Sequence, residues 1–392
     1  MDSALKLLFD SEIGDRVAGF LRGRGERARI VAPRWVRQSV LSGSDQDFVP
    51  RATWAEDAAE PELQGEAPGN FIVLAEDAAR ERAIIQSLSL GPGRRAFGLF
   101  RHIVPALICH MDGLARPSSA GSLKRYAILC VPRSGSRYLT TTLCRAGVGA
   151  PLEHLRPPLA IISTAGKLGF PSAMKAVEEY GQANGIFGTK LVSTFLLEAS
   201  AGRISNLDKN VEWLAKRGYR FVYLERPLID SVVSSYVAVH LKKWHFFGPL
   251  ADTDRQRLQR APFSENQIWG EYIRFKADKA IMNRLVAKHE MATFQYGDVC
   301  DRTDRITGWI CDQLSVDPVQ LKPVASIQIP VATRSQSSIY EEFTDRLEQL
   351  LERRKGELDS VVVACISEKT GLQQAAAQKM LREYEGSVAV PA

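Results

Sequence analysis

The feature that most constrains the fold is an unbroken apolar run at residues 126–131, Tyr-Ala-Ile-Leu-Cys-Val, followed by a turn rich in Gly and Ser. An apolar run without polar alternation is typical of a strand buried on both faces, as in a parallel sheet. Residues 138–146 then have the pattern of a helix. Strand, tight turn and helix in this order predict the start of a parallel α/β sheet.

The rest of the chain continues this alternation of strands and helices. A second apolar run at residues 221–224 precedes a helix at 228–243, and further segments follow: a helix at 267–288, a strand at 291–296, a helix at 301–314 and an amphipathic helix at 340–358. We therefore predict an α/β fold, with a P-loop-like parallel sheet flanked by helices, over residues 123–392.

The first 120 residues have strand and helix signals of their own. Strands are expected at residues 28–32, 71–75 and 96–100, with a helix at 76–88. This pattern predicts a small N-terminal α/β domain over residues 1–120, without a catalytic motif to indicate its role. The small residues at 116–122 read as the linker between the two domains.

The turn after the first long apolar run has the residues of an anion site. Backbone N–H groups and the positive end of the next helix dipole meet at such a turn. Glycine lets the backbone approach an anion, serines add hydroxyl donors, and arginine adds charge and a planar donor fork. The residues are Pro132, Arg133, Ser134, Gly135, Ser136 and Arg137. The alternative is a serine that caps the helix and binds no ligand.

A second basic element follows the second long apolar run. Arg226 ends that run, Pro227 suits a first helical turn, and Ser234 lies about two turns into the helix. An arginine at a strand end and a serine on the next helix can hold one phosphate between them. Because both features are common in proteins, their chance occurrence is the alternative.

Taken in order, these two elements resemble the sulfotransferases that use 3′-phosphoadenosine 5′-phosphosulfate, and in particular the bacterial trehalose/lipopolysaccharide sulfotransferase type. The resemblance rests on Pro-Arg-Ser-Gly-Ser at residues 132–136 and on Arg-Pro at 226–227, with a serine eight residues after that arginine. Further segments resemble that type in the same order: residues 146–154, 186–191, 236–244, 314–318 and 334–346. The resemblance spans about residues 124–352 and leaves the first 120 outside.

The resemblance implies the roles of the donor-binding residues. Residues 132–137 would hold the 5′-phosphosulfate, with Arg133 acting on the transferred group. Arg226 and Ser234 would hold the 3′-phosphate, and Arg334 would close over the nucleotide. The donor is a co-substrate, and the sequence offers no convincing metal cluster.

The resemblance also implies an acceptor that is a sugar or glycoconjugate hydroxyl. It implies that Glu153 is the catalytic base. His154 is the alternative base, because an imidazole changes its protonation state near neutral pH. Lys190 would contact the sulfate or the acceptor, or else is a solvated lysine beside a strand. On one helix face, Tyr236, His240 and Trp244 would line a sugar pocket, or else pack in the core. Departures from the family pattern at residues 137–138, 154 and 236 put trehalose itself in doubt.

Composition sets the remaining expectations. The 51 Lys and Arg against 45 Asp and Glu give a net charge of +6, which suits an anionic small molecule but is too weak to indicate nucleic acid. Six scattered cysteines without a CxxC pair favour a reducing, cytoplasmic location. No apolar stretch has the length of a membrane span, and a homodimer is compatible with the sequence.

Two alternatives to a sulfotransferase remain open at this point. A nucleotide-dependent kinase shares the strand, loop and helix of the anion site, but the Lys-[Ser/Thr] pair that would hold phosphate and Mg²⁺ is absent. A catalytically inactive nucleotide-binding scaffold would keep the same loops and act through its N-terminal domain.

Overall fold

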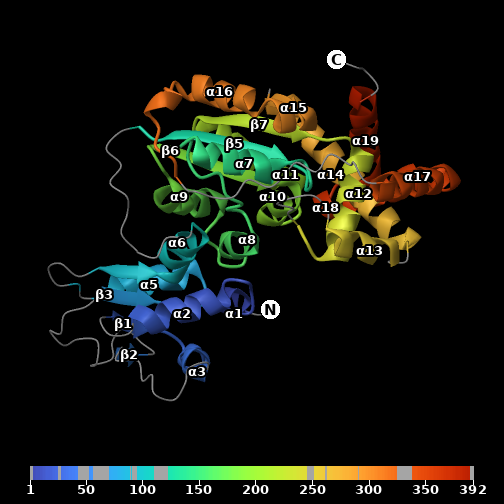
Figure 1. The fold of residues 1–392 in the computed structure, drawn as a ribbon. Helices are drawn as coiled ribbons and strands as arrows, with labels where there is room; N and C mark the ends of the chain where they lie inside the picture. Colours follow the sequence, from blue (N-terminus) through green and yellow to red (C-terminus); the bar gives the residue numbers. More distant parts are fainter. Residues whose placement is uncertain are drawn as a thin grey trace. The chain divides into compact units, whose positions relative to one another are not determined.

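A computed structural model describes residues 3–24, 28–42, 53–55, 70–88, 90, 95–109, 122–244, 251–260, 263–289, 291–324 and 338–388. The chain divides into two compact units. The first combines residues 1–118 with residues 154–181, and the second combines residues 119–153 with residues 182–392. Figure 1 shows the elements of both units coloured along the chain.

The second unit is built on a four-stranded parallel sheet in the order β6-β5-β7-β8. Its strands are β5 (Lys124–Cys130), β6 (Ile186–Val192), β7 (Tyr219–Glu225) and β8 (Ala292–Gln295). The parallel sheet predicted from the apolar runs is therefore confirmed. After β5 the chain crosses to one neighbour and then returns to the other side, so the strand order reverses between β5 and β7. In open α/β sheets this reversal leaves a crevice beyond the carboxyl ends of the two strands.

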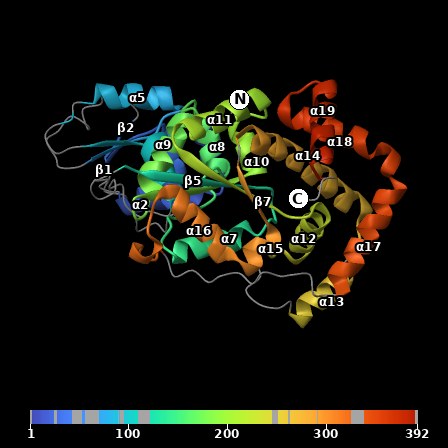
Figure 2. The same ribbon diagram turned by 90° about the horizontal axis from the view of Figure 1, so that it is seen from above.

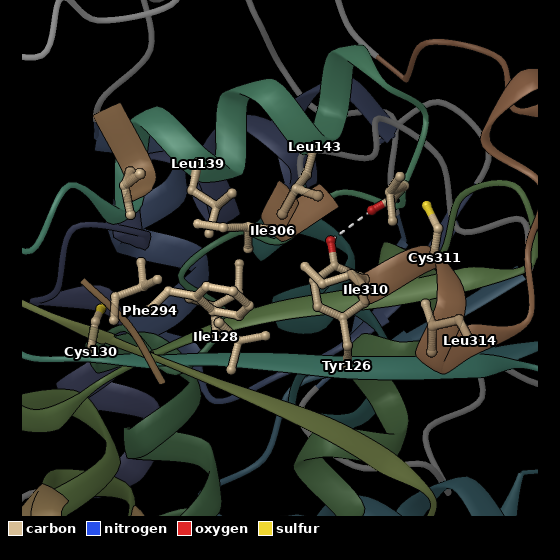
Figure 3. Close-up of a cluster of buried hydrophobic side chains, with 14 of the residues drawn as sticks. Tyr126, Ile128, Cys130, Leu139, Leu143, Phe294, Ile306, Ile310, Cys311 and Leu314 are labelled. Carbon is tan, nitrogen blue, oxygen red and sulfur yellow. Dashed lines mark hydrogen bonds between the residues drawn. The ribbon is translucent and has the colours of Figure 1, made fainter. Parts of the chain in front are cut away.

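One face of this sheet is covered by α7 (Ser136–Arg145), α15 (Tyr296–Asp301) and α16 (Thr303–Leu314). Figure 3 shows Leu139 and Leu143 of α7 reaching toward Ile128 on β5, with Phe294 and Ile310 completing the buried cluster. The Tyr126 hydroxyl donates to the Val148 carbonyl at 2.6 Å, which satisfies the one polar atom of that ring inside the core. This core fixes the position at which α7 begins.

Helices also pack on one another beyond the strands of this unit. The long α14 (Glu265–His289) contacts α12 (Leu228–Leu241), α17 (Ser338–Arg353), α18 (Lys355–Thr370) and α19 (Gln374–Val388), and Figures 1 and 2 both show these five together. The remaining elements of the unit are α10 (Ser193–Ala199), α11 (Ile204–Lys216), α13 (Asp252–Arg260) and η2 (Pro318–Gln320). Within the described ranges, no helix combines the length and apolar character needed to cross a membrane.

The first unit holds a second four-stranded parallel sheet in the order β2-β1-β3-β4. Its strands are β1 (Ala28–Val31), β2 (Thr53–Ala55), β3 (Asn70–Val73) and β4 (Ala96–Gly98). The helices are α1 (Ala4–Phe9), α2 (Gly14–Arg24), α3 (Arg34–Ser42), α5 (Ala78–Ser87), the π-helix η1 (Leu99–Ile103), α6 (Val104–Ile108), α8 (Pro157–Ser163) and α9 (Phe170–Gly181). The predicted N-terminal strands are present, although each is shorter than expected.

Residues 154–181 pack with the N-terminal segment, which the sequence did not indicate. Helix α9 contacts α6, and the Cys109 thiol lies 3.7 Å from the Val177 carbonyl. The predicted linker lies almost entirely outside the described residues. The expected single helix at 340–358 is wrong, because a turn at Arg354 separates α17 from α18.

A buried carboxyl group of the first unit is placed against the backbone where β4 ends. Glu81 accepts the Phe100 N–H at 3.0 Å, and the Leu99 and Arg101 N–H groups also bind it. Burial raises the pKa of Glu81 to about 8, although these N–H groups favour the charged form. The folded unit thus keeps a proton on Glu81 that an unfolded chain loses near pH 4.5.

We expect the stability of the first unit to fall as pH rises from about 4.5 to 8. Between these pH values the folded state binds one proton more than the unfolded state. The free energy of unfolding is therefore highest below pH 4.5 and falls by up to about 1.4 kcal/mol per pH unit until pH 8. Glu81→Gln cannot ionise and should remove this dependence in calorimetric unfolding between pH 5 and 9. The exposed Glu76→Gln is the matched control. An unchanged pH slope in Glu81→Gln would contradict the assignment.

Candidate functional site

The loop between β5 and α7 has the backbone of an anion site. Arg133 and Gly135 both have positive φ, 68° and 82°, and Gly135 forms the N-cap of α7 without any side-chain capping hydrogen bond. The first-turn N–H groups of α7 therefore lack the serine cap that was the alternative explanation of this motif. Ser134 is 2% exposed, and its hydroxyl interacts with the thiol of Cys130 at the end of β5.

Arg133 connects this loop to the helix after β7. Its Nε donates to the Ser234 Oγ on α12 at 3.1 Å, and a terminal nitrogen donates to the Trp244 carbonyl just beyond that helix. Burial lowers the pKa of the Arg133 guanidinium, and the nearby Arg226 charge acts in the same direction. Arg133 and Ser234 thus bring the loop after β5 and the helix after β7 together, whereas the sequence predicted a pairing of Ser234 with Arg226.

Arg226 lies at the end of β7 and faces the same loop. A terminal nitrogen of its guanidinium donates to the Arg133 carbonyl at 2.9 Å, while the Nε is buried and has no hydrogen-bond partner within the described ranges. The guanidinium carbon lies 4.1 Å from the centre of the Tyr296 ring. Lys279 of α14 donates to the Arg226 carbonyl, and its Nζ lies 3.5 Å from a Glu225 carboxylate oxygen. Lys279 therefore holds the end of β7 against α14.

The Tyr296 ring also packs against the loop glycine. A Cβ atom at Gly135 would lie 2.9 Å from the ring, closer than real Cβ contacts allow. The same ring thus contacts Gly135 on one strand end and Arg226 on the other. Burial raises the pKa of the Tyr296 phenol to about 12, while Arg226 opposes the rise.

Tyr340 of α17 is a second tyrosine near the two arginines. Its hydroxyl is buried and forms no hydrogen bond in the structure. Burial raises the pKa of Tyr340, and the charges of Arg133 and Arg226 act in the opposite direction, because the phenol lies within electrostatic reach of both. Sequence reasoning missed both tyrosines. Tyr296 directly follows β8, so the strand-end rule that found Arg226 could have found it, whereas nothing in the sequence places α17 here.

Glu153 and Lys190 form an ion pair beside the loop. Lys190 lies on β6 opposite Ile128 of β5 and is 4% exposed, while the Glu153 side chain is 32% exposed. The Lys190 N–H donates to the Leu152 carbonyl at 2.9 Å, which holds the segment before Glu153 along β6. Lys190 acts electrostatically on the thiol of Cys130, the last residue of β5, so the pair is close to the start of the loop.

The remaining predicted residues are placed differently. His154 is fully buried and belongs to the first unit. Tyr236 is fully buried, contacts the His240 ring at a tilt and the Phe343 ring edge-on, and accepts the Ser264 N–H at 2.9 Å, which is the environment of a core residue. His240 lines a surface pocket and Trp244 is 54% exposed.

The flanks of the motif and the C-terminal arginine complete the set. Pro132 and Ser136 bound the loop, and Ser136 is buried at the first position of α7. Burial raises the pKa of the Cys144 thiol, and the charge of Arg137, seven residues earlier on the same helix, opposes that rise. Arg334 lies outside the described residues.

Comparison with known proteins gives two sulfotransferase domains with a distant structural likeness. The sulfotransferase domain of the Synechococcus PCC 7002 olefin synthase has 15% identity and a TM-score of 0.31, over 71% of this chain and 98% of that domain. The sulfotransferase domain of the curacin biosynthetic pathway has 11% identity and a TM-score of 0.28, over 60% of this chain and 99% of that domain. No protein-family model matches the sequence, and no curated protein matches it either.

We expect Gly135→Ala to disturb the site more than its backbone strain alone explains. A left-handed conformation costs a non-glycine residue about 1–2 kcal/mol, and at this position the new methyl group also pushes on Tyr296. Gly185→Ala is the matched control, because Gly185 has φ +70° with open space around it. Both variants should unfold at lower denaturant concentration, but only Gly135→Ala should lose affinity for adenosine 3′,5′-bisphosphate. Equal affinities would show that the contact is unimportant to the site.

Proposed function

We propose that this protein transfers a sulfuryl group from 3′-phosphoadenosine 5′-phosphosulfate to a hydroxyl group of a sugar or glycoconjugate. One observation carries the proposal: two buried donors, the Arg226 Nε and the Tyr340 hydroxyl, have no hydrogen-bond partner among the residues that the structure describes. Each can donate a hydrogen bond, and buried donors are nearly always satisfied in folded proteins. A bound anion with several acceptor oxygens would satisfy them together.

The charge of the region supports a ligand with two anionic groups. Among the described residues, neither Arg133 nor Arg226 has a carboxylate within ion-pair distance. The loop and the N-terminus of α7 form one group of donors. Arg226 donates to the Arg133 carbonyl of that loop, and the Ser234 hydroxyl accepts from the Arg133 Nε, so both residues lie against it. We assign the phosphosulfate to the loop and the 3′-phosphate to Arg226 and Ser234, which is the division that the family resemblance implies.

The acceptor side of the reaction needs a base for the hydroxyl proton. Glu153 is the proposed base, because its side chain reaches solvent while the neighbouring His154 has no exposed surface. Glu153 takes the proton as the acceptor oxygen forms its bond to sulfur and the bond from sulfur to the phosphate oxygen breaks. Lys190, which pairs with Glu153, and Arg133, which binds Ser234, would offset the negative charge that spreads over the transferred oxygens.

The direct test is product formation by the full chain. Incubation with 3′-phosphoadenosine 5′-phosphosulfate and a panel of sugars and glycoconjugates should yield an acceptor heavier by one sulfuryl group, measured by mass spectrometry. Release of adenosine 3′,5′-bisphosphate in equal amount would complete the stoichiometry. Nucleotide binding without turnover on any hydroxyl acceptor would instead support the inactive scaffold, and transfer of phosphate from ATP would support the kinase.

The 3′-phosphate assignment predicts a selective loss of binding. Ser234→Ala and Arg226→Ala should weaken adenosine 3′,5′-bisphosphate by roughly 10- to 150-fold, since a hydrogen bond to a charged group contributes about 1.5–3 kcal/mol. Adenosine 5′-phosphate should bind these variants nearly as it binds the wild type. The adjacent Ser235→Ala is the matched control, because the Ser235 hydroxyl binds Glu271 at 2.9 Å instead. Calorimetric titration measures all four proteins, and an equal loss for both nucleotides would refute the assignment.

The proposed base predicts a loss confined to turnover. Glu153→Gln keeps the shape of the side chain but cannot accept the proton, so kcat should fall by about 10²–10⁴-fold while binding of the bisphosphate stays nearly unchanged. His154→Gln should reduce kcat much less. The acidic limb of the kcat/KM profile should follow a carboxylate rather than an imidazole. If His154→Gln abolishes turnover and Glu153→Gln does not, the two roles are reversed.

A further inference from the structure

The end of α12 and the exposed face of α13 line an open surface pocket of about 430 Å³. Its lining residues are His240 of α12 and Thr253, Gln256, Arg257 and Arg260 of α13. The α13 residues follow the spacing i, i+3, i+4, i+7, which places them on one side of the helix. One face of α13 therefore forms most of the pocket lining. The pocket volume lies in the range of small-molecule sites.

The lining of this pocket is cationic. Two of the five residues are arginines, a third is a histidine, and the other two are neutral hydrogen-bonding side chains. In the described part of the chain, no carboxylate lies within 4.0 Å of Arg257 or Arg260. Helix α13 has two carboxylates: Asp252, which is exposed in the first turn, and Asp254, which is buried and bound by Lys243 at 2.7 and 2.8 Å. An anionic ligand is the partner that such a lining recognises.

The packing of α12 and α13 holds the two walls of the pocket in place. Asp254 and Leu258 are buried on the inner side of α13, and the Lys243 pair joins that side to the end of α12. On the other wall, the His240 ring packs at a tilt on Tyr236 with ring centres 4.2 Å apart, and its Nδ1 lies 3.0 Å from the Tyr236 carbonyl. The cationic groups thus project from a fixed frame.

The pocket is connected to the donor site through the residue that Arg133 binds. Trp244 lies four residues beyond His240 in the segment that leads to α13, and its carbonyl accepts a hydrogen bond from Arg133. A ligand that contacts His240 is therefore four residues along the chain from the residue that contacts the proposed sulfate-binding loop. The acceptor, rather than the nucleotide, is the ligand that would extend from one place to the other.

We infer that this pocket binds an anionic group of the acceptor, a carboxylate, phosphate or sulfate, so that the substrate class is an acidic sugar or glycoconjugate. The inference rests on the proposed function for its assignment to the acceptor. The anion site itself follows from the pocket alone and can be tested without turnover.

The experiment follows the Cε1 proton resonance of His240, identified by its loss in His240→Gln, with the donor site saturated by adenosine 3′,5′-bisphosphate. Inorganic phosphate and glucuronate are the anionic probes, and glucose is the neutral one. The resonance should shift saturably with at least one anion and not with glucose. The double variant Arg257→Gln/Arg260→Gln should weaken that binding by about tenfold or more. Arg255→Gln, which changes an exposed arginine outside the pocket on the same helix, should leave it unchanged.

Three results would overturn the inference. One is a wild-type resonance that does not shift saturably with either anion up to tens of millimolar. Another is an equal loss in Arg255→Gln, which would mean that only the general charge of the surface matters. The third is a weaker affinity of the double variant for the bisphosphate, which would assign the arginines to the donor site. If the bisphosphate fails to bind even the wild type, the proposed function fails, while the phosphate titration still decides whether the pocket is an anion site.

Discussion

The site depends on two arginines held side by side without a carboxylate to balance them. The Arg226 guanidinium donates to the Arg133 carbonyl, and the charge of Arg226 lowers the pKa of Arg133. Like charges in a partly buried place are unfavourable unless an opposite charge joins them. The protein offsets part of the cost with Ser234, the Trp244 carbonyl and the Tyr296 ring, all of which accept from or face the guanidinium groups. A bound anion would supply the remaining compensation.

Much of this arrangement follows from local sequence. An apolar run without alternation identifies β5 and β7, and the rule that polar residues gather at the carboxyl edge of a parallel sheet brings Arg133 and Arg226 together. Ser234 follows from helical spacing alone. The same rule applied to β8 would have selected Tyr296. These residues can be predicted from the sequence because each lies close to a strand that is recognisable from its own composition.

Other parts depend on packing that no short window contains. The stripe of Tyr236, His240 and Trp244 has helical spacing, but burial separates its members: the first is in the core, the second lines a pocket and the third is exposed. Tyr340 reaches the arginines only because α17 packs on α12. Residues 154–181 pack with the first unit through contacts with residues that are distant in the sequence. The composition of a linker gives no information on such contacts.

The close approach of Gly135 to the Tyr296 ring links two positions that are 161 residues apart in the sequence. A side chain at position 135 and a large ring at position 296 exclude one another. Among chains that share this fold, the two positions should therefore vary together: a larger residue at the first is compatible only with a smaller one at the second. A chain with the smaller residue at position 296 would also lose the aromatic ring that contacts Arg226. A change of the loop residue at position 135 would therefore also change the electrostatic environment of Arg226.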